Sequence, residues 1–191
     1  DTDWHTFRGD NNRGGYAPAT LQESPTLKWN TPLGTRLTAP VVAGDWLYVA
    51  DKDTRTVHAI SATTGKAAWR FAADAMVDSP PTRYGGSVYF GCRDGFVYCL
   101  RLDDGALVWR FRAAPVDRRT VAFGQVESLW PVHGSVLVLD GVVYFAAGRS
   151  SFLDGGIMVY GLDARTGEVR HSHKLEGPWP DIEKDTGTPF D

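Results

Sequence analysis

A tryptophan that recurs every 40 residues is the feature that most constrains the fold of this chain. Trp29, Trp69 and Trp109 are separated by 40 residues each, and glycines at Gly65 and Gly105 stand four positions before the second and the third. Self-similarity at a period of about 20 to 50 residues is typical of repeat architectures, in which each unit buries its apolar face against the next. The chain is therefore predicted to be an array of similar units.

A third copy of the unit is longer than the first two. It opens at residues 140–145 with Asp-Gly-Val-Val-Tyr-Phe and ends at residues 166–171 with Thr-Gly-Glu-Val-Arg-His. His171 stands where the other copies have tryptophan, 62 residues after Trp109. The third unit is therefore predicted to keep the pattern while carrying an insertion.

Each unit is predicted to contain four short strands. In the second unit, the apolar runs 87–92, 96–102 and 107–111 are separated by Asp94-Gly95 and Asp104-Gly105. Asp-Gly between apolar runs is a strong hairpin signal, because both central residues of that turn favour positive φ. Four antiparallel strands per about 40 residues are typical of a propeller blade. We therefore predict an all-β fold, a β-propeller of four-stranded antiparallel blades; the alternative is an unrelated β-sandwich whose spacing coincides.

Composition and charge exclude several classes of protein. The formal net charge of −3 excludes the basic character expected of a nucleic-acid coat. With 42% apolar and 23% charged residues, the chain has the composition of a folded protein. No apolar run approaches the ~20 residues that span a bilayer, so no membrane-spanning segment is predicted. If Cys92 lies opposite Val97, Cys92 and Cys99 are diagonal neighbours ~7–8 Å apart, beyond the reach of a disulfide.

The repeat resembles a known family at an eleven-residue motif. Residues 59–69, Ala-Ile-Ser-Ala-Thr-Thr-Gly-Lys-Ala-Ala-Trp, resemble the tryptophan-docking motif of the PQQ-type (pyrroloquinoline-quinone-like) β-propeller repeats. Residues 99–109 and 161–171 match the motif in part. The family includes the lipoprotein propellers of the outer-membrane barrel-assembly machinery and the propellers of quinoprotein dehydrogenases. The resemblance implies a structural docking role for Ala59, Gly65, Trp69, Cys99, Gly105, Trp109, Gly161, Asp163, Gly167 and His171.

The physical interpretation of the motif is that it joins one blade to the next. The glycine permits a left-handed turn and leaves space above it, and the small first residue leaves space below. The indole then lies flat between the two and buries a large apolar area. We expect each tryptophan to contact the small residue and the glycine of its own motif, as Trp69 would contact Ala59 and Gly65.

The chain is predicted to have three parts. Residues 1–26 form a lead segment, residues 27–175 a partial propeller, and residues 176–191 an irregular tail rich in proline and glycine. The propeller part begins with a lone strand around residues 27–29 and continues with blades at about 37–72, 76–113 and 128–175. Propellers close with ~4–8 blades. We therefore expect an incomplete ring, which the remaining blades of a longer propeller or a second copy would complete.

Two insertions interrupt the period, at residues 113–131 and 148–156. Loops that lengthen a repeat usually gather on one face, often the binding face. We predict that both insertions project from the same face and together form a ligand site. Its candidate residues are Glu127, Trp130, His133 and Arg149. Trp130 would supply an exposed apolar platform; the alternative is that its ring packs inside the protein.

No metal site and no catalytic residues are predicted. His171 and His173 share one face of a predicted strand, but two ligands are too few for a closed zinc site. The sequence contains no Gly-x-Ser-x-Gly elbow and no Gly-x-Gly-x-x-Gly motif that opens a helix. Whether the chain is an enzyme is therefore left open, with the motifs favouring a protein that is not one.

The resemblance implies a function. It implies a non-catalytic bacterial scaffold, periplasmic or secreted, that binds a protein or a glycan and needs no cofactor. The alternative is a fragment of a PQQ-dependent alcohol or sugar dehydrogenase, in which PQQ acts with a calcium ion and Glu127 is the motivated calcium ligand. Such dehydrogenases carry a disulfide between adjacent cysteines. Cys92 and Cys99 are not adjacent in this sequence, which weakens the alternative.

Overall fold

The computed structural model describes residues 3–18, 20, 23–122 and 124–177, and these residues form strands and no helix. The strands are β1 (Val41–Ala43), β2 (Trp46–Asp51), β3 (Thr56–Ser61), β4 (Ala67–Ala72), β5 (Thr82–Tyr84), β6 (Ser87–Gly91), β7 (Phe96–Arg101), β8 (Leu107–Arg112), β9 (Arg119–Ala122), β10 (Gln125–Ser128), β11 (Leu137–Leu139), β12 (Val142–Ala147), β13 (Ile157–Asp163) and β14 (Val169–Leu175). Within this part of the chain, no helix is long and apolar enough to cross a membrane.

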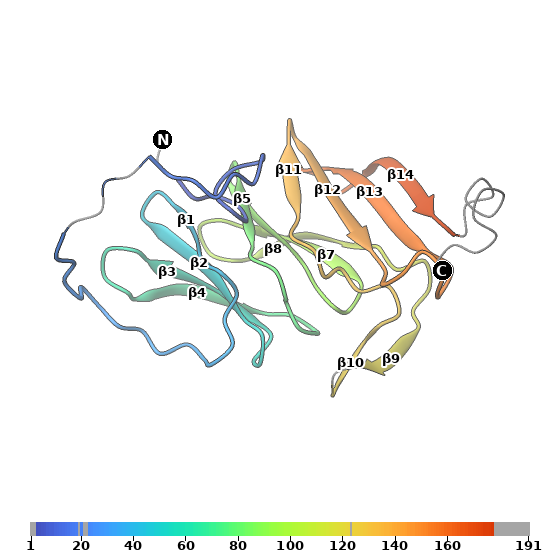
Figure 1. Cartoon of the computed structure of the whole chain (residues 1–191), viewed down its shortest axis with the longest axis horizontal. Helices are drawn as coiled ribbons and strands as arrows, with labels where there is room; N and C mark the ends of the chain where they lie inside the picture. The colour runs from blue at the N-terminus through green and yellow to red at the C-terminus, as the bar shows by residue number, and fades with distance from the viewer. Residues whose placement is uncertain (1–2, 19, 21–22, 123, 178–191) are drawn as a thin grey trace.

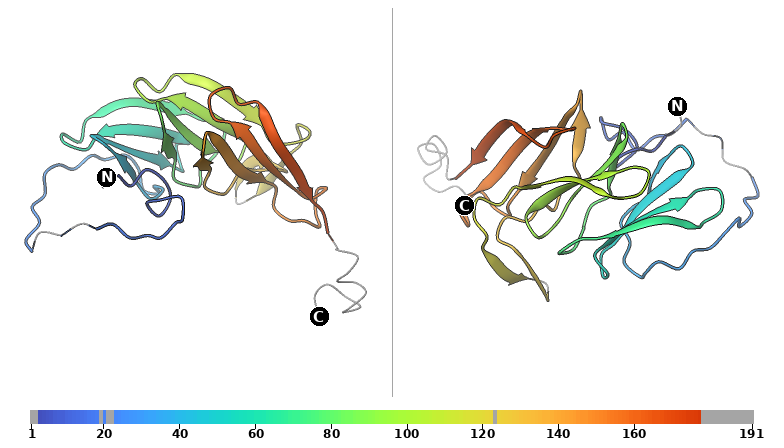
Figure 2. Two further views of the ribbon diagram at one scale, coloured as in Figure 1. Left: turned by 90° about the horizontal axis from the view of Figure 1, so that it is seen from above. Right: turned by 180° about the vertical axis from the view of Figure 1, so that it is seen from behind.

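Three sheets of four antiparallel strands make up the body of the protein. Their strand orders are β1-β2-β3-β4, β5-β6-β7-β8 and β11-β12-β13-β14, and β9 and β10 form a separate two-stranded sheet. The three large sheets lie side by side in an open arc (Figure 1, Figure 2). The predicted all-β fold, an incomplete propeller of four-stranded antiparallel blades, is therefore confirmed.

The turns and the burial pattern follow from the sequence. Asp140 and Gly141 connect β11 to β12 with φ values of 48° and 75°, and two positive φ values are what the Asp-Gly hairpin turn requires. Along β12, Phe145 and Ala147 are buried whereas Tyr144 and Ala146, which alternate with them, are exposed. Successive side chains of a strand point to opposite faces. One face of this sheet therefore packs against its neighbour and the other faces outward.

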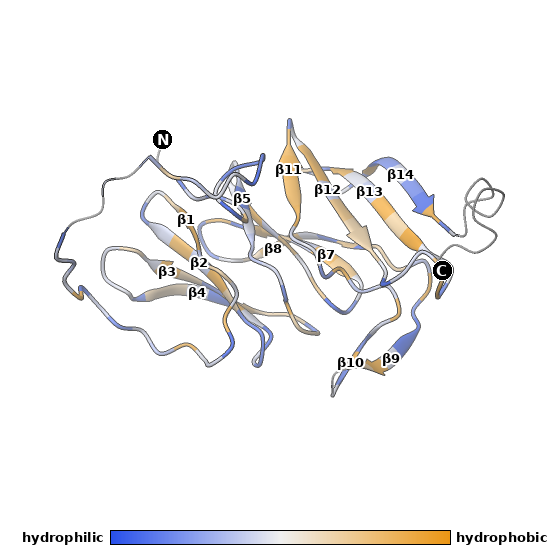
Figure 3. Cartoon of the chain, in the orientation of Figure 1, coloured by the Kyte–Doolittle hydropathy of each residue, from blue (hydrophilic) through white to orange (hydrophobic). Residues whose placement is uncertain are grey.

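Two apolar clusters fill the spaces between the sheets. The first lies between β1–β4 and β5–β8 and includes Trp69 and Phe90. The second lies between β5–β8 and β11–β14 and includes Tyr89 and Phe145. The inner strand β11 is apolar along its length, whereas the outer strand β14 is mostly hydrophilic (Figure 3). Burial between neighbouring sheets is thus the main source of stability.

The lead segment contacts the inner strand of every sheet. The carbonyl oxygens of Trp4 and His5 accept hydrogen bonds from backbone N–H groups in β1 (2.9 Å) and β5 (2.8 Å). The side chain of Asn11 donates to a carbonyl of β11 (3.1 Å). The strand predicted around residues 27–29 is not found, because this segment has no partner strand among the described residues with which to form a ladder. Apart from residues 176 and 177, the predicted tail lies outside the described residues.

Cys92 and Cys99 are both free and buried. Val97 pairs with Gly91 rather than with Cys92, so the predicted register was wrong by one residue. The reason is the length of the hairpin loop, which contains three residues (93–95) rather than the two assumed. The Cys92 N–H accordingly donates to the carbonyl of Phe96 (3.0 Å). The two thiols belong to different apolar clusters, on opposite faces of the β5–β8 sheet.

Candidate functional site

Each of the three repeated tryptophans lies against a glycine of the following repeat. Trp29 contacts Gly65, Trp69 contacts Gly105, and Trp109 contacts Gly167; a Cβ atom built on Gly105 would lie 2.5 Å from Cε3 of Trp69. The three indole N–H groups donate to the carbonyl oxygens of Ala62 (2.9 Å), Leu102 (2.8 Å) and Ala164 (3.1 Å). In each case the accepting residue stands three positions before the glycine.

This geometry corrects the expected pairing of each tryptophan with the glycine of its own motif. Trp69 is the cross-strand neighbour of Ala59, as the motif requires, but its ring reaches Gly105 instead of Gly65. Phe71, two residues further along β4, also points toward the second sheet, where it meets Phe90. The side chains of this face of β4 are therefore directed at the next blade, and Gly65 receives the ring of the segment that precedes it.

Asp163 orders the turn at the end of β13. Its Oδ1 accepts the backbone N–H groups of Arg165 and Thr166, each at 2.9 Å, and its Oδ2 pairs with Arg170. The Thr166 N–H and the Arg170 guanidinium lower the pKa of Asp163 to about 2. The carboxylate is thus a structural element of the turn that holds Gly167 beneath Trp109.

The two insertions meet at one end of the sheets. The first contains the β9–β10 hairpin, and the second is the connection between β12 and β13 (Figure 1). The guanidinium of Arg149 in the second insertion pairs with Glu127 of β10 and lies 3.5 Å from the carbonyl of Ser128. This contact confirms the prediction that the insertions emerge on the same side.

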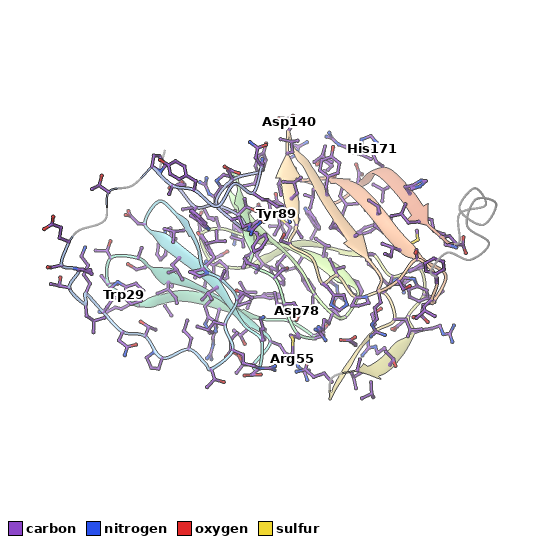
Figure 4. The ribbon with its side chains drawn as sticks, viewed as in Figure 1. Trp29, Arg55, Asp78, Tyr89, Asp140 and His171 are labelled. Atoms are coloured by element: carbon purple, nitrogen blue, oxygen red, sulfur yellow. The ribbon has the colours of Figure 1, made fainter. Side chains whose placement is uncertain are left out.

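Glu127 lies within a continuous chain of charged groups. Its side chain has no exposed surface, and Arg93 approaches its Oε2 at 2.7 Å while Arg149 pairs with Oε1. Arg93 also contacts Asp78 (2.6 Å), and Asp78 contacts His133 Nδ1 (3.2 Å). We call these five residues the ion-pair chain. Asp78 lies at the end of the sheets opposite Asp140 and His171 (Figure 4).

The ion-pair chain ties together segments from all three blades. Its residues come from the β4–β5 connection, the β6–β7 turn, β10, the β10–β11 connection and the second insertion. Burial by itself would raise the pKa of Asp78, but the hydrogen bonds from His133 and Arg93 outweigh it and hold the pKa below its usual value. Asp78 is therefore charged at neutral pH, and each carboxylate of the chain faces at least one cation.

The prediction that Trp130 is an exposed platform is wrong. Only 5% of its surface is exposed, and it belongs to the second apolar cluster together with Ala113 and Val132. Burying this large apolar ring is more favourable than leaving it in water. The alternative interpretation, a packing anchor, is the one that fits. Of the four candidate residues, Glu127, His133 and Arg149 thus converge in one polar network and Trp130 does not.

Asp78 and Arg93 were missed at the sequence level. Arg93 precedes an Asp-Gly turn and Asp78 lies in a blade connection, which are positions where charged residues are common. The signal that distinguishes them is their pairing with residues up to 55 positions away, which a single sequence does not display.

A pocket of about 280 Å³ lies beside the ion-pair chain. Its lining residues are Arg55, Asp74, Ala75, Asp94, Arg119, Val126, Glu127 and Ser128. Asp94 is hydrogen-bonded by the hydroxyl of Tyr98 (2.5 Å) and by the N–H of Phe96 (2.9 Å), and its burial raises its pKa above the usual value. The pocket therefore has acidic and basic groups and one aliphatic wall at Val126.

Glu127 does not fit the role of a calcium ligand. A calcium ion is bound by several oxygen atoms, mostly from carboxylates and carbonyls. Both carboxylate oxygens of Glu127 are paired with guanidinium groups, which would repel a cation at the same place. Among the described residues, no three His, Cys, Asp or Glu side chains are grouped so that they could hold a metal.

Comparison with known proteins relates the chain to one family. The family model described as outer membrane protein assembly factor BamB matches residues 15–179. No curated protein matches the chain.

Solved structures share the fold. Quinohemoprotein alcohol dehydrogenase from Comamonas testosteroni has 21% identity and a TM-score of 0.69, over 91% of this chain and 27% of that chain. Quinohemoprotein alcohol dehydrogenase ADHIIG from Pseudomonas putida HK5 has 17% identity and a TM-score of 0.69, over 91% of this chain and 26% of that chain. A europium-containing methanol dehydrogenase has 16% identity and a TM-score of 0.72, over 93% of this chain and 32% of that chain. The chain thus spans about a quarter to a third of these proteins, and at such identities the likeness shows the fold alone.

Proposed function

The chain belongs to the family of the outer membrane protein assembly factor BamB, and on this premise we propose that it is a non-catalytic scaffold that binds another protein as part of a larger propeller. The proposal assigns the scaffold to the periplasm of a bacterium, or to its exterior, and gives it no cofactor. The observation that carries it is the β9–β10 hairpin, an exposed apolar surface on a fixed base.

The hairpin presents aliphatic side chains to solvent. Val121 and Val126 are directly opposite one another, with 74% and 55% of their surfaces exposed, and Val116 before the hairpin is 46% exposed. An isolated two-stranded sheet is marginally stable in water. Here Glu127 on the same hairpin is buried against Arg93 and Arg149, so the hairpin is held to the body of the protein. Exposed apolar residues on an ordered support are typical of interaction surfaces.

The same features favour a protein ligand over a glycan. Aliphatic side chains such as Val121 and Val126 suit the apolar core of a protein interface. The aromatic platform on which the expectation of a glycan depended is absent, because Trp130 is buried. Nothing in the described residues favours the dehydrogenase alternative, since Glu127 is unsuited to calcium and the dehydrogenase likenesses show the fold alone.

The test is binding to a purified outer-membrane-protein assembly complex from which the native BamB subunit is left out. Surface plasmon resonance would compare the wild-type chain with V121D and V126D. We expect each substitution to weaken binding at least about ten-fold, because it places a charge in an apolar contact. V108D is the matched control, since Val108 is 50% exposed on β8, away from the hairpin. The proposal is wrong if the complex does not bind, or if V108D weakens binding as much as V121D.

A further inference from the structure

A groove lies at the end of the sheets opposite the ion-pair chain. Two pockets meet there, of about 430 and 350 Å³, and both are lined by Tyr84 and Gly85 of the β5–β6 turn. Gly141 of the β11–β12 turn lines the second pocket. Both turns connect the first and second strands of their sheets and emerge at the end marked by Asp140, whereas Asp78 lies at the other end (Figure 4). We call the two pockets together the turn groove.

The lead segment forms one wall of the first pocket. The charged and polar side chains of this pocket come from that segment and from β5, and they are Asp3, His5, Asp10 and Arg83. The wall is held in place, because Asp3 accepts the backbone N–H that precedes β2 (3.0 Å) and Asp10 accepts a backbone N–H of its own segment (3.2 Å). Each of these hydrogen bonds uses the Oδ1 atom. The first pocket is therefore an ordered polar site.

The second pocket lies between the second and third sheets. Ser87, Val108 and Arg165 are among its lining residues. Asp163 and Arg170 also line it, but they are paired with each other, so their charges are compensated. The second pocket therefore adds an apolar wall at Val108 and a cation at Arg165.

Two exposed tyrosines flank the first pocket. Tyr84 is 39% exposed and lines both pockets of the turn groove. Tyr16, in the lead segment, is 77% exposed and lines a third pocket of about 330 Å³, which shares three lining residues with the first. A tyrosine ring offers a flat apolar face with a polar tip. The polar pocket is thus placed between two aromatic surfaces.

Glycines keep the groove open. A Cβ atom built on Gly85, Gly86 or Gly141 would meet nothing within 4 Å. Positive φ explains the glycines at positions 85 and 141, but Gly86 does not have positive φ. A side chain would therefore fit at Gly86 without backbone strain, and it would occupy the groove. With glycine there, a ligand can approach the main chain.

We propose that the turn groove binds a short, uncharged oligosaccharide. A sugar ring has a face of C–H groups, which stacks on an aromatic ring, and a rim of hydroxyl groups that donate and accept hydrogen bonds. Tyr84 and Tyr16 supply the aromatic faces. Asp3 and Asp10 supply acceptors for the hydroxyl groups and Arg83 supplies donors. Because carboxylates and cations line the groove together, the arrangement favours a ligand without net charge.

An extended peptide fits the first pocket less well. Such a peptide binds by adding a strand to an exposed sheet edge through main-chain hydrogen bonds. Here the edge N–H groups of Val42 and Arg83 already donate to carbonyl oxygens of the lead segment. The pocket therefore offers side chains and not a free strand edge. The turn groove is separate from the β9–β10 hairpin, so this inference goes beyond the proposed function.

The experiment is saturation-transfer NMR with the full chain and two uncharged β-1,4-linked sugars, cellohexaose and chitohexaose. We expect at least one of them to bind with a Kd of about 1 mM or tighter, with the strongest saturation on the ring C–H protons. Tyr84→Ala should weaken binding at least about ten-fold, because it removes the stacking face. Tyr84→Phe keeps the ring and should bind within about three-fold of wild type.

A second pair of variants tests the position of the sugar. Gly86→Phe fills the groove and should abolish binding. Gly134→Phe is the matched control, because a Cβ there also meets nothing within 4 Å, but Gly134 follows His133 at the opposite end of the sheets. Melting temperatures would verify that each variant is folded. The proposal is overturned if neither sugar binds, or if the sugar still binds to Gly86→Phe as it does to wild type. V121D should bind the sugar normally, so failure here is distinct from failure of the hairpin proposal.

Discussion

The guanidinium of Arg149 pairs with Glu127, a carboxylate that has no exposed surface, and this contact joins the two insertions of the repeat array. A buried carboxylate is costly unless it is paired. Glu127 is paired twice, with Arg149 and with Arg93, so three segments of the chain are fixed relative to one another. The hairpin that carries the exposed valines owes its position to this arrangement.

Removing the buried carboxylate should therefore destabilise the protein. We expect Glu127→Ala to lower the free energy of unfolding by about 3–5 kcal/mol, because Arg149 loses its carboxylate partner and Arg93 keeps only Asp78, in a largely buried place. Urea denaturation followed by circular dichroism measures the change. Asp117→Ala is the control, since Asp117 pairs with Arg119 on the surface and should change stability by less than about 1 kcal/mol. Equal effects of the two substitutions would contradict the structural role of Glu127.

The contact between Trp69 and Gly105 can be tested against a glycine without a neighbour. Gly105 has φ of +70° and lies against the indole, whereas Gly85 has φ of +55° and nothing within 4 Å of a built Cβ. Both alanine substitutions incur backbone strain, of about 1 kcal/mol. We expect Gly105→Ala to lower the melting temperature several degrees more than Gly85→Ala, because a Cβ atom on Gly105 would displace the indole of Trp69, whereas one on Gly85 displaces nothing. Matching melting temperatures would argue that the indole does not press on Gly105.

The indole of Trp109 should contribute strongly to stability. Trp109→Ala removes a large ring from the junction between the second and third blades, and loss of such a side chain typically costs about 3–5 kcal/mol. Differential scanning calorimetry should show a marked fall in melting temperature. Trp46→Ala is the control, because Trp46 is 38% exposed at the start of β2. A melting temperature within about a degree of wild type for Trp109→Ala would refute the docking role.

Most of the blade architecture could be predicted from the sequence, and so could three residues of the ion-pair chain, Glu127, His133 and Arg149, whereas their partners could not. The spacing of Trp69 and Trp109 and the Asp-Gly turns are local signals, and they indicate strands and hairpins directly. Which glycine receives Trp69 depends on the direction in which β4 presents its side chains, and this is set by packing between sheets. The partners of Glu127 lie 34 and 22 residues away along the chain, so only the fold brings them together.

The pH dependence of stability should differ in sign between two aspartates. The pKa of Asp78 in the folded protein lies below its usual value, so the unfolded chain binds the proton more tightly. The stabilisation that Asp78 contributes is thus present above about pH 4 and is lost as the pH falls through its folded pKa. The free energy of unfolding of the wild type minus that of Asp78→Asn, measured with denaturant between about pH 6 and 3, should decrease as the pH falls.

Asp94 provides the opposite case. Its burial raises the folded pKa, so its contribution is greatest below the unfolded pKa and is lost as the pH rises through the folded value. The free energy of unfolding of the wild type minus that of Asp94→Asn should therefore decrease as the pH rises, even though the hydroxyl of Tyr98 donates a hydrogen bond to the carboxylate. Parallel pH curves for the two differences would contradict these assignments.

We propose that Glu127 holds the scaffold together and does not bind a cofactor ion. The most direct measurement is the absorption spectrum of PQQ with calcium, titrated with wild-type chain and with Glu127→Gln. We expect that neither protein shifts the spectrum, because both oxygens of Glu127 are already paired with arginines. A shift with wild type that Glu127→Gln abolishes would contradict it and make Glu127 part of a cofactor site.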